Sequence, residues 1–460
     1  MKNTHDMTDI ARTRALLVLN QLALEKHHHL DRIITDLIDG ADLALSMRDR
    51  GFLNMLIFGV VRWRGRLDWI IRLYSKTPLE KIDPNVLNIL RLGLFQIFFL
   101  DRVPDSAAVN TSVELAKQTA PPWVVKFVNA ILRTAIRQGD SLPYPSMEKN
   151  PADALSVLKS FPLWLIKRWL ARFGQKNCEN LCDAVNAIPP ITVRCNTLKT
   201  TREELLENLT PDAERLSPAE DAPDGVLIIN PAKPVHELSA FNNGWFQVQD
   251  EAAQLVTCLL APCPHETVLD ACAGLGGKTG HIAQMMNNTG RIIAADQDPG
   301  KLKLLESAMI RLGVKNVTAR FCDFEKPERT LPEAPFDRIL LDAPCSGLGV
   351  IRRNPDIKWD VARQNLIHFQ KKQALLLENI SFLVKPGGAI VYGVCSFEPE
   401  ENEDVIDAFL NVHPNFEIDN QFSSPVFDIG RFVDKRGFFR TFPHIHGMDG
   451  FFAAVLKRVR

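Results

Sequence analysis

The chain has 460 residues, of which 46% are hydrophobic and 24% charged, and its formal net charge is −1. This composition is typical of a globular protein and excludes general disorder, and the length exceeds what one hydrophobic core usually supports, so we expect three domains. No apolar run approaches the ~20 residues of a membrane span, and charges lie where a signal peptide would be apolar, which predicts a cytosolic protein without a membrane partner.

Cysteine usage and charge distribution narrow the function further. Nine cysteines without a secretory signal predict reduced thiols rather than a disulfide framework, and no metal site is expected. Residues 48–76 carry seven basic and two acidic side chains, and residues 430–460 repeat that imbalance. Each basic segment alone could be a solvated face, but two of them in a neutral protein favour an RNA or DNA surface.

The first half of the chain predicts two small domains. Residues 1–140 have apolar residues at three- and four-residue spacing throughout, interrupted only by prolines, which predicts an all-helical domain. Residues 141–151 are rich in Pro and Ser and predict a linker. Residues 152–243 mix helical segments with short strands at 191–196 and 225–230, which indicates a small α+β module.

From 244 to 460, predicted strands and helices alternate. Repeated β-α units imply a Rossmann-like α/β domain with a mostly parallel sheet and helices on both faces. Ligands in such sheets bind at the carboxyl ends of the strands. The residues that follow each predicted strand are therefore candidates for a ligand site.

The segment VLDACAGLGGKTG, residues 268–280, reads as a strand, a glycine-rich turn and the start of a helix. A phosphate-binding P-loop is excluded because Cys272 stands where that motif needs its first glycine. The dinucleotide pattern is weak because its last glycine is Thr279. S-adenosylmethionine, which has no pyrophosphate, suits the turn best.

Two aspartates end the next two predicted strands. Asp296 lies about 20 residues past the glycine turn, where a carboxylate can accept both ribose hydroxyls. Asp323 could accept from an adenine amino group. Either residue alone would more often be a cap or turn residue, but in series they favour a nucleoside site.

Cysteines follow two further predicted strands: Cys345 in LLDAPCSGLGV and Cys395 in VYGVCSF. A thiolate that adds to C6 of a pyrimidine makes C5 nucleophilic enough to attack the methyl group of a sulfonium. Asp342 could protonate or hydrogen-bond N3 of a cytosine, and the second cysteine could assist expulsion of the enzyme. The residues alone do not decide which cysteine attacks.

These motifs resemble those of the RNA cytosine-C5 methyltransferase family, in its bacterial 16S ribosomal RNA branch. The resemblance rests on DACAGLGGKT (270–279), Asp296, Asp323, LLDAPCSGLGVIRRNPDIKW (340–359) and VYGVCSFEPEEN (391–402). It implies an N-terminal domain similar to the antitermination factor NusB, a small module and a methyltransferase domain. It also implies that the product is 5-methylcytosine in 16S rRNA and that the cofactor is S-adenosylmethionine.

The resemblance assigns roles that the residues left open. It makes Cys395 the nucleophile and Cys345 the residue that assists product release. It implies a cofactor site lined by Cys272, Ala273, Gly274, Leu275, Gly276, Gly277, Lys278, Asp296, Asp323 and Asp342, with Asp342 also facing the base. The sequence departs from the family in having Gly274-Leu275 for the usual Ala-Pro and Val394 for a threonine.

Two other functions stay open: a tRNA cytosine-C5 methyltransferase, which the same catalytic motifs would serve, and a non-catalytic RNA-binding or antitermination factor. We expect a monomer that contacts RNA through residues 48–76 and through Arg352, Arg353 and Lys358. Because C6 is inaccessible in a stacked base, the substrate should be a loop or partly unfolded RNA.

Overall fold

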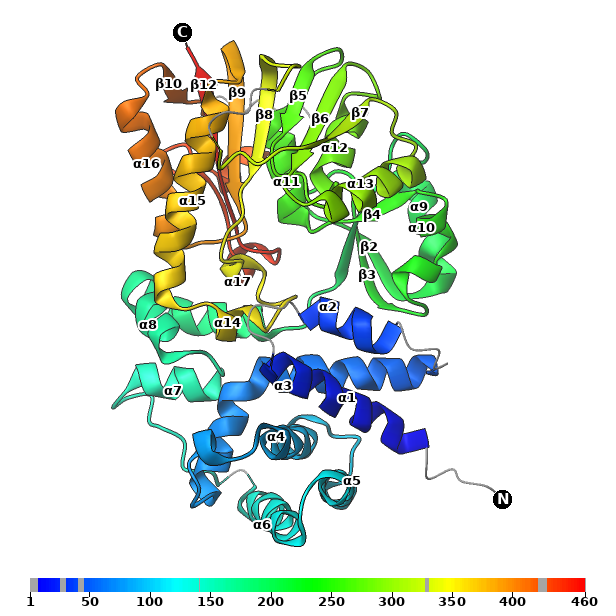
Figure 1. Ribbon diagram of the computed structural model, residues 1–460, viewed down its shortest axis with the longest axis vertical. Coiled ribbons are helices and arrows are strands. Elements are labelled where there is room, and N and C mark those ends of the chain that lie inside the picture. The colour runs from blue at the N-terminus through cyan, green and yellow to red at the C-terminus, as the bar shows by residue number, and fades with distance from the viewer. Residues whose placement is uncertain are drawn as a thin grey trace. The chain divides into compact units, whose positions relative to one another are not determined.

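The computed structural model describes residues 7–24, 30–39, 45–139, 141–326, 331–420 and 428–459. The chain forms two compact units, Met1–Asn186 with Arg353–Val361, and Ala187–Arg352 with Ala362–Arg460 (Figure 1). Within the described ranges, no helix combines the length and apolar character that crossing a membrane requires.

The first unit is helical, and it contains the predicted helical residues 1–140 together with residues 152–186, which were expected in the small α+β module. Its α-helices are α1 (Met7–Leu24), α2 (Leu30–Ile34), α3 (Met47–Tyr74), α4 (Pro84–Phe99), α5 (Asp105–Thr119), α6 (Pro122–Gln138), α7 (Pro151–Leu158), α8 (Leu163–Asn186) and α14 (Ile357–Asp360). Prolines set the helix starts: Asp83 caps α4 by accepting from the backbone N–H groups of Asn85 and Val86, and Pro84 is the first helical residue.

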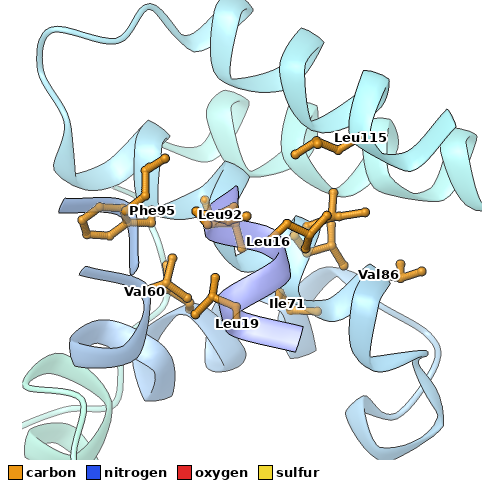
Figure 2. Packing of buried hydrophobic residues seen from close by; sticks show 14 of the residues in the cluster. Leu16, Leu19, Val60, Ile71, Val86, Leu92, Phe95 and Leu115 are labelled. Carbon is orange, nitrogen blue, oxygen red and sulfur yellow. The ribbon is translucent and has the colours of Figure 1, made fainter. Parts of the chain in front are cut away.

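Apolar side chains from α1, α3, α4 and α5 meet in one core. Figure 2 shows part of this core, in which Leu16 and Leu19 of α1 lie among side chains of the other helices. Residues at three- and four-residue spacing share one helix face, so the apolar spacing of the sequence gives each helix an apolar face that packs in this core. Helix α4 contributes Leu92 and Phe95, which are labelled in Figure 2, to this core, and both are buried.

The segment Arg353–Val361 belongs to this helical unit although it follows the Cys345 loop in sequence. Trp359 Nε1 donates to the Val61 carbonyl at 2.7 Å, and the Leu30 N–H donates to Asp356 at 3.2 Å. Lys358 is fully buried, with Nζ 3.2 Å from Asn186 Oδ1 and 4.1 Å from the centroid of an aromatic ring. The prediction that Lys358 contacts RNA is therefore wrong, because apolar neighbours bury it.

The second unit contains two sheets. The smaller, antiparallel sheet has the order β2-β3-β1-β4. It consists of β1 (Ile191–Cys195), β2 (Ala213–Pro218), β3 (Gly225–Pro231) and β4 (Phe246–Val248), with helices α9 (Arg202–Leu209) and α10 (Ser239–Asn242). Thr201 and Glu204 form a capping box that starts α9.

The larger sheet has the order β10-β12-β9-β8-β5-β6-β7, and β11 pairs with β12. Its strands are β5 (Thr267–Asp270), β6 (Arg291–Asp296), β7 (Val317–Phe321), β8 (Phe336–Asp342), β9 (Val384–Val394), β10 (Phe416–Ile418), β11 (Phe439–Thr441) and β12 (Phe451–Arg458). The strands from β9 to β7 pair in parallel, and β10, β11 and β12 are antiparallel. The predicted mostly parallel sheet is confirmed.

Helices cover both faces of this sheet, as predicted. They are α11 (Glu251–Leu260), α12 (Gly277–Met285), α13 (Pro299–Leu312), α15 (Arg363–Ser381), α16 (Glu403–Val412) and the short α17 (Pro443–His446). Leu340 and Val391 pack with Leu255 of α11, whereas Leu341 packs with Leu377 of α15 in a separate core. Neighbouring residues of one strand thus face opposite layers, as the period of two requires. Chain order reverses on either side of β5, and such a switch point is where doubly wound sheets bind ligands.

Candidate functional site

The glycine-rich turn links the end of β5 to α12. Gly274 and Gly276 have φ angles of 54° and 83°, which favour glycine, and a Cβ at Gly276 would lie 2.8 Å from Leu305 Cγ. A Cβ at Gly274 or Gly277 would meet nothing within 4 Å. The turn is therefore packed against α13 on one side and open on the other, which leaves room for a ligand against its backbone.

Asp270, which the sequence analysis did not single out, lies beneath the turn. It is almost completely buried and accepts a hydrogen bond from Thr279 Oγ1 at 2.7 Å, so it joins the end of β5 to the first turn of α12. Burial raises the pKa of Asp270 to about 7. Its position directly before the glycine turn was the only sequence signal for it.

The two predicted nucleoside-binding aspartates lie at neighbouring strand ends. Asp296 ends β6, and its carboxylate accepts from the N–H of Gly274 and the N–H of Asp298, both at 2.9 Å. Asp323 follows β7 and pairs with Lys326 at 2.9 Å. The structure thus joins Asp296 directly to the glycine turn.

Lys278 and Asp342 form an ion pair with Nζ 2.6 Å from Oδ2. Lys278 comes from α12 and Asp342 from the end of β8, so the pair connects the turn to the cysteine loops. Burial lowers the pKa of Lys278, but the negative charges of Asp342 and Cys395 outweigh it and raise that pKa above its usual value. Lys278 is therefore a fixed positive charge beside both groups.

The two cysteines lie against each other, with Cys345 Sγ 3.2 Å from Cys395 Sγ. The cause is strand register: β8 and β9 are parallel neighbours in which Asp342 pairs with Gly393. The Gly349 N–H then donates to the Cys395 carbonyl at 2.9 Å, which holds the two loops together. The hydrogen bond to Cys395 and burial both raise the pKa of Cys345 well above its usual value. Either sulfur can be the donor of this hydrogen bond.

A buried polar cluster behind the cysteines was not predicted. Glu401, at the end of a 3₁₀ turn (Pro399–Glu401), accepts hydrogen bonds from Ser346 Oγ at 2.5 Å and Ser396 Oγ at 2.6 Å. Each serine directly follows one of the cysteines. The acidic segment after Cys395 was visible in the sequence, but its role depended on a partner 55 residues away.

The basic segments differ in how their side chains are engaged. On α3, Arg48 and Arg72 are exposed, and Arg72 lies 3.9 Å from Glu80, whereas Arg62 is buried. In the C-terminal segment, Arg436 pairs with Asp407, and Arg440 pairs with Asp434 at 2.9 Å. Much of the positive charge in the C-terminal segment is thus neutralised by ion pairs.

Arg352 was also predicted to contact RNA, and this prediction is wrong. Its guanidinium is buried, donates to Asp449, and lies 3.2 Å from Asp250. It also donates to the Gly447 carbonyl at 2.6 Å. Arg352 fixes the chain where the Cys345 loop ends.

Comparisons with known proteins agree with this architecture. Residues 257–457 match the family model described as 16S rRNA methyltransferase RsmB/F. The chain is 36% identical over 415 residues to the probable ribosomal RNA small subunit methyltransferase B of Bacillus subtilis, covering 90% of this chain and 92% of that protein. The chain belongs to the RsmB/F family of 16S rRNA methyltransferases.

Other members and structures support the same assignment. Ribosomal RNA small subunit methyltransferase B of Escherichia coli strain 536 is 36% identical over 388 residues, with 84% of this chain and 88% of that protein covered. The crystal structure of PH0851 superposes with a TM-score of 0.79 at 30% identity, covering 96% of this chain and 98% of that one. Residues 9–137 match the NusB family, and residues 161–236 match the ferredoxin-like domain of RsmF/B-like methyltransferases. The NusB-like helical domain and small α+β module expected of this RsmB/F family member are thus confirmed.

Proposed function

We propose that this RsmB/F family member methylates C5 of a cytosine in 16S rRNA through a covalent adduct between Cys395 and C6, with S-adenosylmethionine as methyl donor. The observation that carries the proposal is the 3.2 Å approach of the Cys345 and Cys395 sulfurs beside the Lys278–Asp342 pair. Two thiols in contact at adjacent strand ends suit one addition and one later elimination.

The glycine turn fits the methyl donor. Its open side leaves the backbone at Gly274 accessible, and Asp296, which accepts from the Gly274 N–H, would accept ribose hydroxyls. Asp323 would accept from the adenine amino group. S-adenosylmethionine, when bound, supplies an electrophilic methyl group on a sulfonium.

The cysteines divide the work at the base. The raised pKa of Cys345 favours its protonated form, and the resemblance to the RNA cytosine-C5 methyltransferases makes Cys395, 3.2 Å away, the attacking sulfur. The Cys395 thiolate forms the S–C6 bond while N3 takes a proton supplied through Asp342, beside the positive charge of Lys278. C5 then takes the methyl group as the S–CH3 bond of the sulfonium breaks. The C5 proton passes to water, N3 returns its proton to Asp342, and the S–C6 bond breaks, which regenerates the Cys395 thiolate. We assign assistance with this last step to Cys345.

The substrate assignment rests on the family and on the helical unit. Relatives over most of the chain are named as small-subunit rRNA methyltransferases. The exposed basic residues of α3 suit contacts to RNA phosphates. Replacing Arg48 and Arg72 by Ala should weaken RNA binding and reduce the slope of log K against log salt by about 0.7–0.9 per lost phosphate contact. An unchanged slope would exclude these two residues from the interface.

The decisive experiment compares the wild type with Cys345→Ala and Cys395→Ala. Each protein is incubated with methyl-labelled S-adenosylmethionine and unmodified 16S rRNA, and a denaturing gel separates free protein from protein joined to RNA. We expect Cys345→Ala to accumulate a methylated adduct and Cys395→Ala to form none. A trapped adduct with Cys395→Ala instead would exchange the roles, and transfer to tRNA but not to 16S rRNA would change the substrate.

A further inference from the structure

Glu401 is a fully buried carboxylate that no step of the proposed mechanism uses. It comes from the 3₁₀ turn between β9 and α16 and receives four hydrogen bonds. The Ser346 N–H donates at 2.7 Å, the Ser346 hydroxyl at 2.5 Å, the Ser396 hydroxyl at 2.6 Å and the Gln373 amide at 3.2 Å. Desolvating a carboxylate is costly, and the four donors that surround Glu401 offset that cost only while they stay in place.

The donors come from both cysteine loops. Ser346 follows Cys345 in the loop after β8, and Ser396 follows Cys395 in the loop after β9. Both hydroxyls reach the same carboxylate oxygen, Oε2. One atom of Glu401 therefore spans the two loops at the residues next to the reacting sulfurs.

Additional contacts fix Glu401 itself. Tyr392, buried in β9, donates its hydroxyl to the Glu401 carbonyl at 2.6 Å. Gln373 of α15 bonds both the Glu401 carboxylate and the Pro344 carbonyl, the latter at 3.0 Å. Pro344 directly precedes Cys345, so the Cys345 loop is held from both sides of the cysteine.

We propose that Glu401 is a positioning residue that holds the Cys345 and Cys395 loops at the separation the reaction needs, acting through Ser346 and Ser396. This inference rests on the proposed function for its kinetic consequence, but the geometry it predicts is independent of catalysis. The negative charge of Glu401 also favours the protonated form of Cys345 and contributes to its raised pKa, in keeping with Cys345 as the thiol of the pair.

The role differs from that of a residue that only stabilises the fold. We call Glu401 with its hydrogen bonds from Ser346 and Ser396 the clamp. Loss of the Ser396 hydrogen bond should slow adduct formation, and loss of the Ser346 hydrogen bond should slow adduct release. A fold defect would instead reduce the rates of both steps by lowering the amount of active protein. Glu401 lies outside the cofactor turn, so affinity for S-adenosylmethionine should be unchanged.

The kinetic test uses single-turnover reactions of full-length Glu401→Gln, Ser346→Ala and Ser396→Ala with 16S rRNA. Glutamine keeps the shape of the side chain but replaces one acceptor oxygen with a donor. We expect Glu401→Gln to lower methyl transfer by about 100-fold, as a misplacement of roughly 1 Å does, with the unfolding midpoint and cofactor affinity near those of the wild type. Glu400→Gln, one residue away and only partly buried, is the matched control and should keep wild-type rates.

A double-mutant comparison checks that Glu401 acts through the serines. If it does, Glu401→Gln should cost little more in a protein that already carries both Ser346→Ala and Ser396→Ala. If Glu401→Gln lowered the rate by the same factor with and without the two serine substitutions, the clamp would be overturned. A wild-type rate in Glu401→Gln would also overturn it. A loss of rate that merely tracks loss of folded protein or of cofactor binding would also overturn it.

A geometric test needs no catalysis. Phenylarsine oxide joins two neighbouring thiols through two As–S bonds with loss of one water, and peptide mapping identifies the pair that is joined. The wild type should be joined at Cys345 and Cys395, and Glu401→Ala should lose this product while Glu400→Ala keeps it. Equal capture in both variants would overturn the inference. If no variant or wild-type protein methylates RNA but capture still depends on Glu401, the proposed function fails and the clamp stands.

Discussion

At Gly349 the two cysteine loops and the chain before β12 lie close together. A Cβ at this residue would lie 2.0 Å from the Gly450 carbonyl oxygen and 2.8 Å from the Cys395 carbonyl oxygen. Both neighbours are backbone atoms, so neither can rotate away. Gly349→Ala must therefore push the Cys345 loop away from the Cys395 loop and from the segment at Gly450.

The structure sets the size of the effect. Two backbone hydrogen bonds, Gly349 N–H to Cys395 O and Gly450 N–H to Gly349 O, both at 2.9 Å, would be strained or broken. At about 0.5–1.5 kcal/mol each, with about 1–3 kcal/mol for overpacking, the total is about 2–6 kcal/mol. We expect this to appear partly as lost stability and partly as a roughly 100-fold slower formation of the Cys395 adduct.

The assay measures the single-turnover rate of adduct formation in a Cys345→Ala background, where the adduct accumulates, together with thermal unfolding. Gly51→Ala is the matched control, because Gly51 lies in α3 with nothing within 4 Å of an added Cβ. That control should be stabilised by about 0.5–1 kcal/mol and keep its adduct rate. A Gly349→Ala protein with wild-type stability and adduct rate would refute the packing described for these loops.

Three further predictions concern buried charges. Lys358→Met should stabilise the helical unit by about 1–4 kcal/mol, seen as a higher thermal midpoint, because it removes the free-energy cost of burying an ionisable amine. Burial lowers the pKa of Lys358, so the unfolded chain binds a proton that the folded protein does not. Stability of the wild type should therefore rise as pH increases toward about 10, and that of the variant should not. Asp270→Asn should flatten the pH profile of stability measured by urea unfolding. Because the pKa of Asp270 is raised to about 7, the folded protein keeps a proton that the unfolded chain releases near pH 4. The free energy of unfolding of the wild type should therefore fall from about pH 4 to 7. Lys278→Met and Asp342→Asn should each slow methyl transfer and show a coupling of about 0.5–3 kcal/mol in a double-mutant cycle; a coupling near zero would contradict the 2.6 Å ion pair.

Sequence patterns were sufficient for the features that depend on local order along the chain. Apolar spacing predicted the helical unit and the β-α alternation, and the residues after β5, β6, β8 and β9 were correctly expected at strand ends. Short edge strands such as β10 and β11 were not predicted, because three residues carry too little periodicity to stand out. The small antiparallel sheet was predicted only through β1 and β3, its two interior strands.

The predictions that failed concerned long charged side chains. Arg352 and Lys358 were expected on a solvent-exposed face that contacts RNA, yet both are buried. The partners of Arg352 are Asp250 and Asp449, each about 100 residues away, and no local pattern marks such pairs. Charge in a sequence predicts exposure only when no distant carboxylate or aromatic ring is folded against it.

The pairing of the two cysteines shows how a reactive geometry follows from sheet register. Parallel pairing of β8 with β9 sets Asp342 opposite Gly393 and sends both loops off the same edge of the sheet. Sulfur contact then depends on where each loop is tied, at Gly349 to the Cys395 carbonyl and at Glu401 to a serine on each side. Because none of these hydrogen bonds involves the cysteine side chains, the two loops should keep their positions in variants that replace either thiol. Separate roles for the two cysteines can therefore be measured one at a time without collapsing the site.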